Sequence, residues 1–253
     1  MQVLITGASS GLGKDFAKDL ANRGYDLVLV ARSKDKLLEL KKELKTKVEI
    51  VEMDLSIEEN LYELYKKYAG KIGLLINNAG FGAFGEFSET DLDTELNMID
   101  LNIKAVHILT KLFLNDFIDR DYGRILNVSS LAAFEPGPLM ATYYATKSYV
   151  YNLTMAIYEE LRRKKSNVKV SVLCPGPTRT GFNDRAQVKF GVRSLKSEYV
   201  VKYTIDKMFK NKLIIIPSFR MKCAVFANRI LGRKLMMRII YKIQKSKTLQ
   251  DKK

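Results

Sequence analysis

The most regular feature of the chain is an alternation of short apolar runs with longer amphipathic segments. Runs such as Leu74-Leu75-Ile76 are continuous, which is typical of parallel strands covered on both faces. Between the runs, apolar residues recur at helical spacing, as at Leu12, Phe16 and Leu20. This pattern predicts a doubly wound α/β domain with a parallel sheet of seven strands. We place the strands near residues 2–6, 26–31, 47–52, 73–77, 123–128, 168–174 and 213–216.

No repeat, low-complexity tract or linker interrupts residues 1–217, and a 253-residue chain suits one such domain with an extension at 218–253. Two cysteines are too few for a disulfide framework, and Cys174 lies in a predicted strand, so we expect a buried reduced thiol. The first strand begins next to Met1, which leaves no room for a signal peptide, and no apolar run reaches the ~18–20 residues of a membrane span. These features predict a cytoplasmic protein.

The C-terminal extension combines apolar residues at helical spacing with a strong positive charge. Residues 219–253 carry eleven Lys or Arg and one acid, so 11 − 1 = +10 of the net charge of +15 lies here and +5 in the rest. We expect a helix around Val225 to Lys245. Such a helix favours peripheral contact of residues 220–247 with an anionic membrane, at the inner membrane surface. Packing on the domain or on a partner subunit, where the helix would close the substrate cleft, is the equal alternative. Nucleic-acid binding is disfavoured because no recognition fold accompanies the charge.

A glycine-rich turn joins the first apolar strand to the first amphipathic helix. The segment reads Thr6-Gly7-Ala8-Ser9-Ser10-Gly11-Leu12-Gly13, and a second buried strand follows at βαβ spacing. The amides at the start of a helix bind phosphate, so this arrangement predicts a dinucleotide cradle. A tight turn of an ordinary α/β protein is the alternative.

A second constellation consists of Tyr143, Lys147, Ser130 and Asn102. A Tyr and a Lys at i and i+4 share one helix face, where the ammonium can lower the pKa of the phenol from ~10 towards neutrality. Tyr-x-x-x-Lys occurs four times in this chain, but only Tyr143 has a hydroxyl residue thirteen positions upstream. Ser130 and Tyr143 can therefore share one carbonyl oxygen, which predicts acid–base chemistry on a carbonyl or alcohol.

Two further motifs accompany these: Asn77-Asn78-Ala79-Gly80 and Pro175-Gly176-Pro177-x-x-Thr180. Taken in their order along the chain, the motifs resemble those of the short-chain dehydrogenase/reductase family in its single-domain form. The resemblance covers residues 2 to about 217 and implies a Rossmann fold and a nicotinamide-dependent oxidoreductase. It implies that Tyr143 is the proton donor and that Lys147 tunes its pKa and binds ribose. It also implies that Ser130 holds the carbonyl and that Asn102 anchors a water relay.

The cofactor-binding residues that the resemblance implies lie in six segments of the chain. They are Gly7, Ser9, Ser10, Gly11, Leu12, Gly13, Arg32, Ser33, Asp54, Leu55, Asn78, Ala79, Gly80, Tyr143, Lys147, Pro175, Gly176, Thr178 and Thr180.

The end of the second strand indicates which cofactor is used. An acid here would accept the adenosine ribose hydroxyl of NAD, but the chain has Arg32-Ser33-Lys34 instead. A guanidinium suits phosphate oxygens, so we predict NADP(H), with a solvated basic helix start as the alternative. Asp54 resembles the family's adenine-contacting acid; as a residue before Ser56 it can equally be structural.

The substrate is less well defined by the sequence. Phe81, Phe84 and Phe87 follow the Asn-Asn-Ala-Gly turn and suggest an apolar substrate, with a core role equally open. Residues 181–195 form a long segment suited to a lid. The chain resembles the subgroup of 3-oxoacyl-CoA reductases and hydroxysteroid dehydrogenases, which implies a lipophilic ketone or aldehyde. An NADP(H)-binding, membrane- or partner-associated protein with little turnover is the alternative.

The remaining expectations concern assembly and metals. In the family, two long helices pair across a two-fold axis, so the resemblance implies a homodimer or homotetramer. Their apolar faces here run from Leu96 to Phe113 and from Tyr144 to Tyr158, although some of these residues must face the sheet. His107 is the only histidine and has no metal-ligating neighbours, so we predict a surface or packing role and no metal site.

Overall fold

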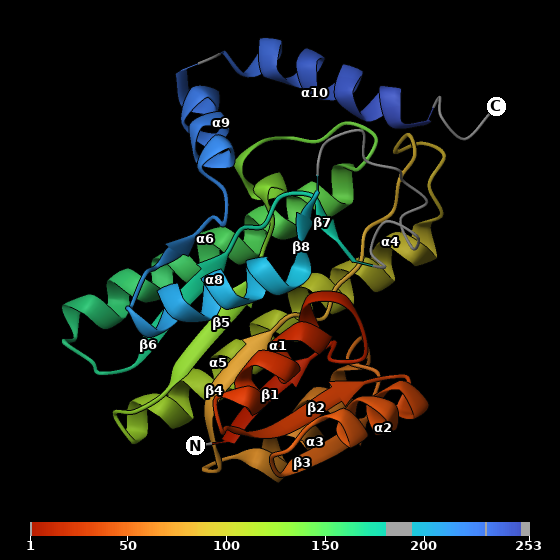
Figure 1. Cartoon of the computed structure of the whole chain (residues 1–253). Helices are drawn as coiled ribbons and strands as arrows, with labels where there is room; N and C mark the ends of the chain where they lie inside the picture. The colour runs from red at the N-terminus through yellow and green to blue at the C-terminus, as the bar shows by residue number, and fades with distance from the viewer. Residues whose placement is uncertain (1, 181–193, 231, 249–253) are drawn as a thin grey trace.

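The computed structural model describes residues 2–180, 194–230 and 232–248. Its centre is a parallel sheet of seven strands in the order β3-β2-β1-β4-β5-β6-β9 (Figure 1). All seven predicted strands are confirmed, each end within one residue of its prediction. The strands are β1 (Gln2–Thr6), β2 (Asp26–Ala31), β3 (Val48–Glu52), β4 (Ile72–Asn77), β5 (Arg124–Val128), β6 (Lys169–Leu173) and β9 (Ile214–Ile215).

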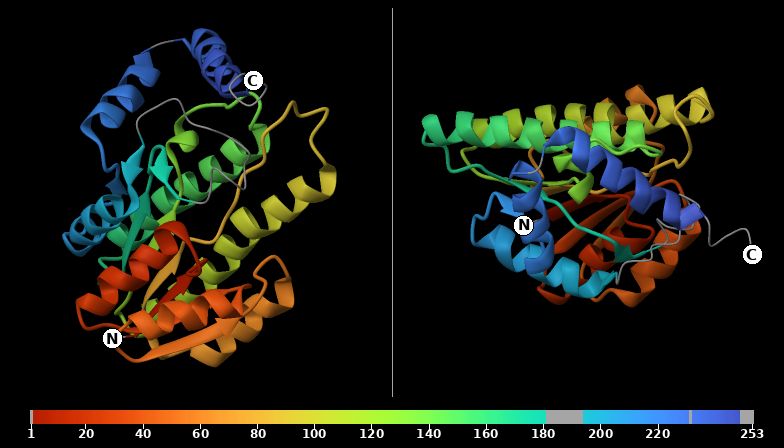
Figure 2. Two further views of the ribbon diagram at one scale, coloured as in Figure 1. Left: turned by 45° about the vertical axis from the view of Figure 1, so that its right-hand side comes forward. Right: turned by 90° about the horizontal axis from the view of Figure 1, so that it is seen from above.

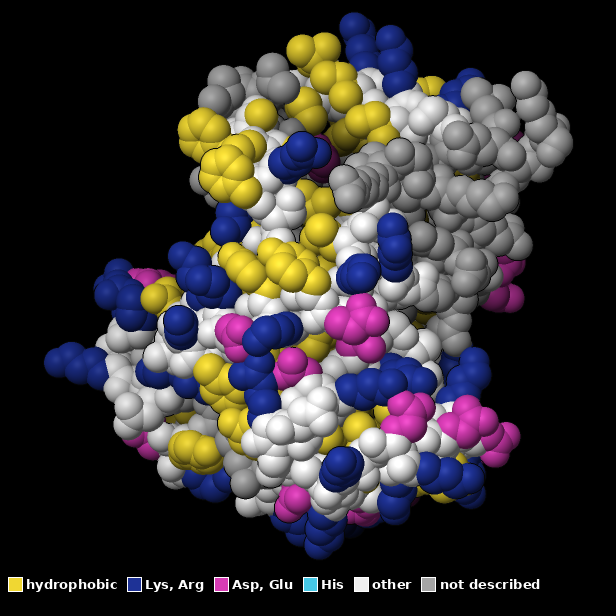
Figure 3. Space-filling model, in the orientation of Figure 1, with side chains coloured by type: hydrophobic (Ala, Val, Ile, Leu, Met, Phe, Trp, Pro, Cys, Tyr) yellow, Lys and Arg dark blue, Asp and Glu magenta, His cyan; other side chains and the backbone are white. Residues whose placement is uncertain are grey.

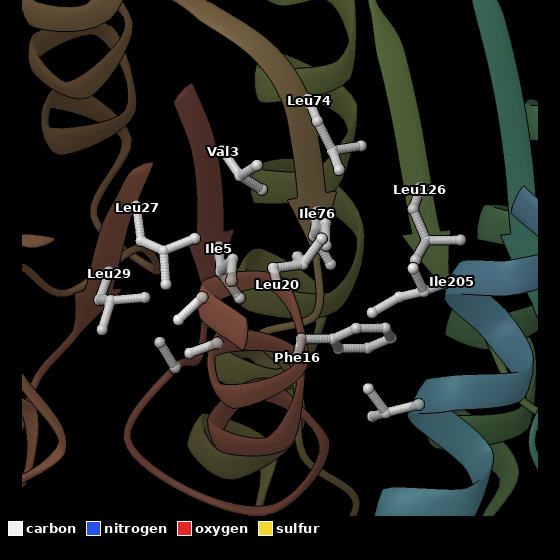
Figure 4. Packing of buried hydrophobic residues seen from close by; sticks show 14 of the residues in the cluster. Val3, Ile5, Phe16, Leu20, Leu27, Leu29, Leu74, Ile76, Leu126 and Ile205 are labelled. Atoms are coloured by element: carbon white, nitrogen blue, oxygen red, sulfur yellow. The ribbon is translucent and has the colours of Figure 1, made fainter. Parts of the chain in front are cut away.

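Helices cover both faces of this sheet, because successive residues of a strand point to opposite faces. Val3 and Ile5 of β1 point towards Phe16 of the first helix (Figure 4), whereas Leu4 belongs to the core on the other face. The first face is covered by α1 (Gly11–Asn22), α2 (Lys34–Glu43) and α8 (Ser197–Phe209). The second is covered by α3 (Glu58–Tyr68), α5 (Ala105–Asp119) and α6 (Ala141–Arg163).

The strand order predicts a ligand crevice between β1 and β4. β1 lies between β2 and β4, so the chain crosses to the other half of the sheet after β3. Loops that follow neighbouring strands diverge at such a point and leave room for a ligand. The segments after β1 and β4 carry Gly7 and Asn78, and both therefore border this crevice.

The short strands β7 (Thr178–Arg179) and β8 (Leu195–Lys196) pair in parallel, apart from the main sheet. The predicted lid falls between them, and its residues 181–193 lie outside the described residues.

The extension is two helices, and the prediction of one continuous helix over Val225 to Lys245 is wrong. α9 (Phe219–Ile230) and α10 (Arg233–Thr248) are separate, with Gly232 between them. Glycine is among the least favourable residues in a helix, which explains the break. The apolar spacing that predicted one helix does not take this into account. Figure 2 shows the pair on the side of the molecule that also carries the start of α6. No helix in the described segments is long and apolar enough to span a bilayer.

The helices expected to pair between subunits have some of their apolar side chains buried in the core and others exposed. α4 (Leu92–Ile99) continues through a π-helical turn, η1 (Asp100–Lys104), into α5. Leu109 and Phe113 of α5 are buried in the core, whereas Leu96 and Ile99 of α4 are 48% and 37% exposed. Only part of the predicted interface face is therefore available to a second subunit.

Candidate active site

The glycine-rich turn after β1 is packed so tightly that side chains are excluded from it. Gly7 and Gly11 have φ values of +66° and +53°, which favour glycine. A Cβ on Gly13 would lie 2.1 Å from the carbonyl oxygen of Gly7, and one on Gly7 would lie 2.8 Å from Cα of Ala79. Ser10 precedes α1 in extended conformation and makes no side-chain cap. The amides at the start of α1 are thus available, and the turn fits a pyrophosphate.

Hydrogen bonds tie the turn after β4 to this cradle. The backbone amides of Asn78 and Ala79 both donate to Oγ1 of Thr6, at 2.9 and 3.0 Å. The Asn78 side chain donates back to the carbonyl oxygens of Thr6 and Gly7. Gly80 then passes so close to the catalytic candidates that its Cβ would lie 2.8 Å from Oδ1 of Asn102. The predicted cofactor residues of both turns therefore border one site.

Asn102 lies in the π-helical turn and is fully buried. Its Oδ1 accepts from the amide of Phe81 at 3.1 Å, and its Nδ2 donates to the Phe81 carbonyl at 2.9 Å. Nδ2 also donates to Oγ1 of Thr146 at 3.1 Å. Asn102 thus joins the loop after β4 to the helix that carries Tyr143. Its role as anchor of a water relay stays a prediction.

Tyr143 and Lys147 lie on α6, where Lys147 is buried and Tyr143 is half-buried. Burial raises the pKa of Tyr143 to about 12, and a hydrogen bond with Ser130 lowers it in part. Burial also lowers the pKa of Lys147 to about 8. The Lys147 ammonium donates to the carbonyl of Val128 at 3.0 Å and lies 5.8 Å from the centre of the Tyr143 ring.

The pKa of Tyr143 therefore shifts in the direction opposite to our prediction. The reasoning from helical spacing considered the neighbouring positive charge but not the loss of solvation, and in the protein alone burial raises the pKa of Tyr143 more than the hydrogen bond with Ser130 lowers it. A hydrogen bond with Ser130 opposes the rise in the pKa of Tyr143, so the two side chains lie close together, and their joint binding of a carbonyl oxygen stays a prediction. Ser130 precedes the 3-10 turn η2 (Leu131–Phe134), and its Oγ also accepts from the amide of Ala132 at 3.1 Å.

The Pro-Gly motif after β6 lies against both the cradle and the catalytic strand end. The amide of Leu131 donates to the carbonyl of Pro175 at 3.0 Å. Thr178 donates to the carbonyl of Gly176 at 2.9 Å, and a Cβ on Gly11 would lie 3.1 Å from Cβ of Thr180. The motif thus completes the rim of the crevice opposite the turn after β4.

Arg32 is at the end of β2, where the adenosine end of a dinucleotide would lie. Its side chain is 54% exposed and its Nη1 is 3.5 Å from Oδ2 of Asp54. Burial raises the pKa of Asp54, but hydrogen bonds from Ser56 and the charge of Arg32 outweigh it and leave the pKa lowered. Asp54 accepts from both the amide and the hydroxyl of Ser56, so it also has the structural role that the sequence left open.

Reasoning from the sequence missed four residues that hold the site together. Ser129 donates to the carbonyl of Lys147 at 2.7 Å, and Thr146 bonds Asn102. Both are adjacent to predicted residues, which is the only signal for them in the sequence. The other two belong to the extension: Met221 packs on Gly176, and Gln244 donates to the hydroxyl of Tyr144 at 2.7 Å. No local pattern indicates contacts across such separations.

The chain has two cysteines and one histidine. Cys174 is a buried free thiol, as predicted, and Cys223 is an exposed one. His107 is exposed, and its Nδ1 lies 2.6 Å from the Tyr149 hydroxyl. Across the described residues no group of His, Cys, Asp or Glu could hold a metal.

Phe81 and Phe84 are half-buried and Phe87 is 68% exposed, so none of the three phenylalanines belongs to the core. A cavity of about 210 Å³ lies between η2, α6, β9 and α9, lined by Phe134, Tyr151, Ile214, Ile216, Lys222, Val225 and Phe226. A larger one of about 310 Å³ contains Gly73, Arg124 and Lys169, at the amino ends of the strands, on the edge opposite the catalytic residues.

A doubly wound sheet with a glycine cradle at its crossover defines a nucleotide-binding α/β protein. The short chain dehydrogenase family model matches residues 1–189. Very-long-chain 3-oxoacyl-CoA reductase of Macaca fascicularis is 37% identical over 172 residues, 64% of this chain and 54% of that protein. An uncharacterized oxidoreductase of Staphylococcus epidermidis is 32% identical over 184 residues, 72% of this chain and 79% of that protein. The chain therefore belongs to the short-chain dehydrogenase/reductase family of oxidoreductases, although its match spans about half the length of the reductase.

Solved structures agree with this assignment. A short-chain dehydrogenase from Sphingobium yanoikuyae in complex with NADPH superimposes with a TM-score of 0.81 at 31% identity, covering 90% of this chain and 93% of that one. A family member from Burkholderia phymatum in complex with NAD gives 0.81 at 25% identity, covering 88% and 91%. The bulky-bulky ketone specific alcohol dehydrogenase from Comamonas testosteroni gives 0.77 at 29% identity, covering 90% and 91%. The fold binds a nicotinamide cofactor, and the choice between NAD and NADP depends on local residues.

Proposed function

We propose that the protein is an NADP(H)-dependent reductase of lipophilic ketones or aldehydes, with Tyr143 as general acid and base. The observation that carries this proposal is the hydrogen-bonded pair of Ser130 and Tyr143 at the edge of the nucleotide crevice. Two hydroxyl groups that converge there can bind one carbonyl oxygen, and the ring of Tyr143 lies 5.8 Å from the buried ammonium of Lys147. A binding protein without turnover has no chemical need of this set.

In the reduction, the bound nicotinamide supplies the hydride to the carbonyl carbon. Tyr143 is protonated at neutral pH, because burial holds its pKa near 12, and can therefore give its proton to the oxygen. Ser130 donates a hydrogen bond to the same oxygen and stabilises the negative charge that develops there.

Lys147 has two roles in this proposal. Its ammonium faces Tyr143 from the same helix, so it stabilises the phenolate left after the proton is transferred. It also lies within reach of Gly80, whose Cβ would be 3.4 Å from its Nζ, and a ribose in the crevice would meet it there. Asn102 keeps this arrangement in place by holding the Phe81 backbone and Thr146.

The preference for NADP(H) rests on Arg32. Its guanidinium is exposed, and its ionic contact with Asp54 is long, so a 2′-phosphate can replace that contact at small cost. Ser33 precedes α2 and makes no side-chain cap, which leaves the amides at the start of α2 available to the same phosphate.

The proposal of an apolar substrate rests on the side chains around the crevice. Phe81, Phe84 and Phe87 are not needed for the core. The cavity of about 210 Å³ beside α9 is lined mainly by aromatic and aliphatic side chains. One of them, Phe134, follows Ser130 by four residues in the chain. The names of the 3-oxoacyl-CoA reductase and of the bulky-bulky ketone dehydrogenase agree with this class of substrate.

Tyr143→Phe tests the reaction, and the chain contains a matched control. Tyr62 is also followed by a lysine four residues later, but it is 49% exposed on α3. With NADPH and a series of apolar ketones and aldehydes, we expect Tyr143→Phe to lower kcat by on the order of 10²–10⁴-fold. Cofactor affinity should stay within a few-fold, and Tyr62→Phe should behave as wild type.

Retention of more than a few per cent of the rate by Tyr143→Phe would show that another group is the acid. If the wild type binds NADPH but reduces none of these compounds, the alternative of a protein with little turnover is favoured.

Arg32→Asp tests the cofactor. The substitution removes the phosphate partner and adds an acceptor for a ribose hydroxyl, so we expect the ratio of NADPH to NADH affinity to fall at least tenfold. Titration of each cofactor by protein fluorescence measures it. Lys42→Asp is the matched control, because Lys42 is exposed in the last turn of α2, at the end of the helix away from Arg32. An unchanged ratio in Arg32→Asp would refute the assignment of NADP(H).

A further inference from the structure

The helices α9 and α10 have an inner side that is packed on the domain. Met221 lies against Gly176, where a Cβ would come 2.1 Å from its sulfur. Ile240 and Gln244 are 5% and 1% exposed. Because Gln244 bonds Tyr144, the residue next to Tyr143, the pair is held in a defined orientation beside the active site.

The outer side of the same helices is apolar but exposed. Isolated exposed apolar residues are common, whereas a row at helical spacing, such as Leu235, Ile239 and Ile243 of α10, marks a surface that contacts something else. Packing on the domain already accounts for the inner residues and does not account for these. The exposed apolar residues are Phe219 (79%), Phe226 (65%), Leu235 (50%), Met237 (36%), Ile239 (38%) and Ile243 (47%).

Basic residues are interspersed with these apolar side chains. No Asp or Glu occurs between residues 219 and 250. Helices of the domain differ in this respect, since Glu43 pairs with Lys14 and Lys18, and Glu159 with Arg162 and Arg163. Figure 3 shows yellow and dark blue side chains together over α9 and α10, and dark blue mixed with magenta lower down. Apart from Lys222, which donates to the hydroxyl of Tyr203 on the domain, the basic residues described as exposed on the pair are Arg220, Lys234, Arg238, Lys242 and Lys245.

We propose that the outer side of α9 and α10 docks on an anionic lipid bilayer. The apolar side chains enter the boundary of the acyl chains while the Lys and Arg side chains reach the lipid phosphates, which is how interfacial helices bind. The two accounts that the sequence left as alternatives are thereby reconciled, because each concerns a different side of the same helices. A second copy of the chain would bring like charges together, and nucleic acid would leave the apolar residues in water.

Vesicle binding by the full chain tests the proposal without cofactor or substrate, so its failure would leave the proposed reaction untouched. We expect co-sedimentation with vesicles of phosphatidylcholine and phosphatidylserine at low salt. Binding should fall on the order of tenfold or more at high salt or with phosphatidylcholine alone, because salt screens the attraction and the neutral lipid lacks it.

Two variants and two matched controls separate the apolar and the charged contributions. Each change is at exposed positions, so unfolding curves should stay unchanged. The apolar variant is Leu235→Ser, Ile239→Ser and Ile243→Ser, at positions that are 38–50% exposed, and its control on the domain is Leu38→Ser, Ile57→Ser and Tyr62→Ser, at positions that are 40–49% exposed. The charge variant is Lys234→Glu, Arg238→Glu and Lys242→Glu, with Lys41→Glu, Lys42→Glu and Lys66→Glu as control.

We expect both variants of the extension to lose binding at least tenfold while both controls bind like wild type. The proposal is wrong if the wild type does not bind anionic vesicles at low salt, or if the controls lose as much as the variants. It is also wrong if light scattering shows a dimer that the apolar variant dissociates while vesicle binding is absent, since that result assigns the surface to a second copy.

Discussion

In the α/β domain Phe16 and Phe113 are fully buried, whereas in the extension Phe219 and Phe226 are 79% and 65% exposed. The charges differ in the same way, because acids accompany the bases of the domain and are missing between residues 219 and 250. Burying an apolar side chain stabilises the fold, so the domain uses its apolar residues for stability. The extension keeps several large apolar side chains in water, which makes them available to a partner.

The largest expected effect follows from this contrast in burial. Phe16→Ala leaves a cavity beneath the sheet and should lower the free energy of unfolding by about 3–5 kcal/mol. Phe226→Ala removes a side chain that is mostly in water and should change it by less than about 0.5 kcal/mol. Urea unfolding followed by circular dichroism measures both. Similar losses in the two variants would mean that α9 is part of the cooperative core.

The buried charge of Lys147 in the active site lowers the stability of the domain. Burial lowers the pKa of Lys147 from 10.5 to about 8, a difference of 10.5 − 8 = 2.5 that corresponds to about 3 kcal/mol of penalty at neutral pH. Lys147→Met should therefore abolish activity and yet raise the free energy of unfolding at pH 7 by up to about 3 kcal/mol. Loss of the bond to Val128 offsets part of this gain.

The pH dependence gives this prediction a definite sign. Between pH 8 and 10.5 the unfolded chain binds more protons at this lysine than the folded chain, so wild-type stability rises with pH. The advantage of Lys147→Met should shrink across that window, measured by unfolding at several pH values. Lys66→Met, at an exposed lysine, serves as control. A variant that is less stable at pH 7, or an advantage that does not depend on pH, would show that the ammonium is not penalised.

The smallest expected effect concerns the contact between the two regions. Gln244 donates to the Tyr144 hydroxyl at 2.7 Å, and a typical hydrogen bond contributes about 1 kcal/mol. A double-mutant cycle of Gln244→Leu and Tyr144→Phe should give a coupling of about 0.5–1.5 kcal/mol in unfolding. Asn152→Leu, which removes only a bond within α6, is the control for single-site effects. Zero coupling would mean that α10 is not held against α6 through this bond.

The order of strands and helices along the chain could be read from the amino acids because buried parallel strands need continuous apolar runs and the helices between them need one apolar face. The cradle and the group around Tyr143 could be read for a similar reason. Gly7 and Gly13 are required by close backbone contacts within short segments, and Tyr143 and Lys147 by one helical turn.

Properties that depend on distant residues could not be read in this way. The pKa of Tyr143 moves upward because surrounding elements remove water from it, and no spacing along one helix reports that loss of solvation. Gln244 meets Tyr144 across 100 residues because α10 crosses the start of α6. Apolar spacing in the extension indicated which residues share a helix face, but only packing against the domain determined that Ile240 is covered and that Ile239 and Ile243 stay exposed.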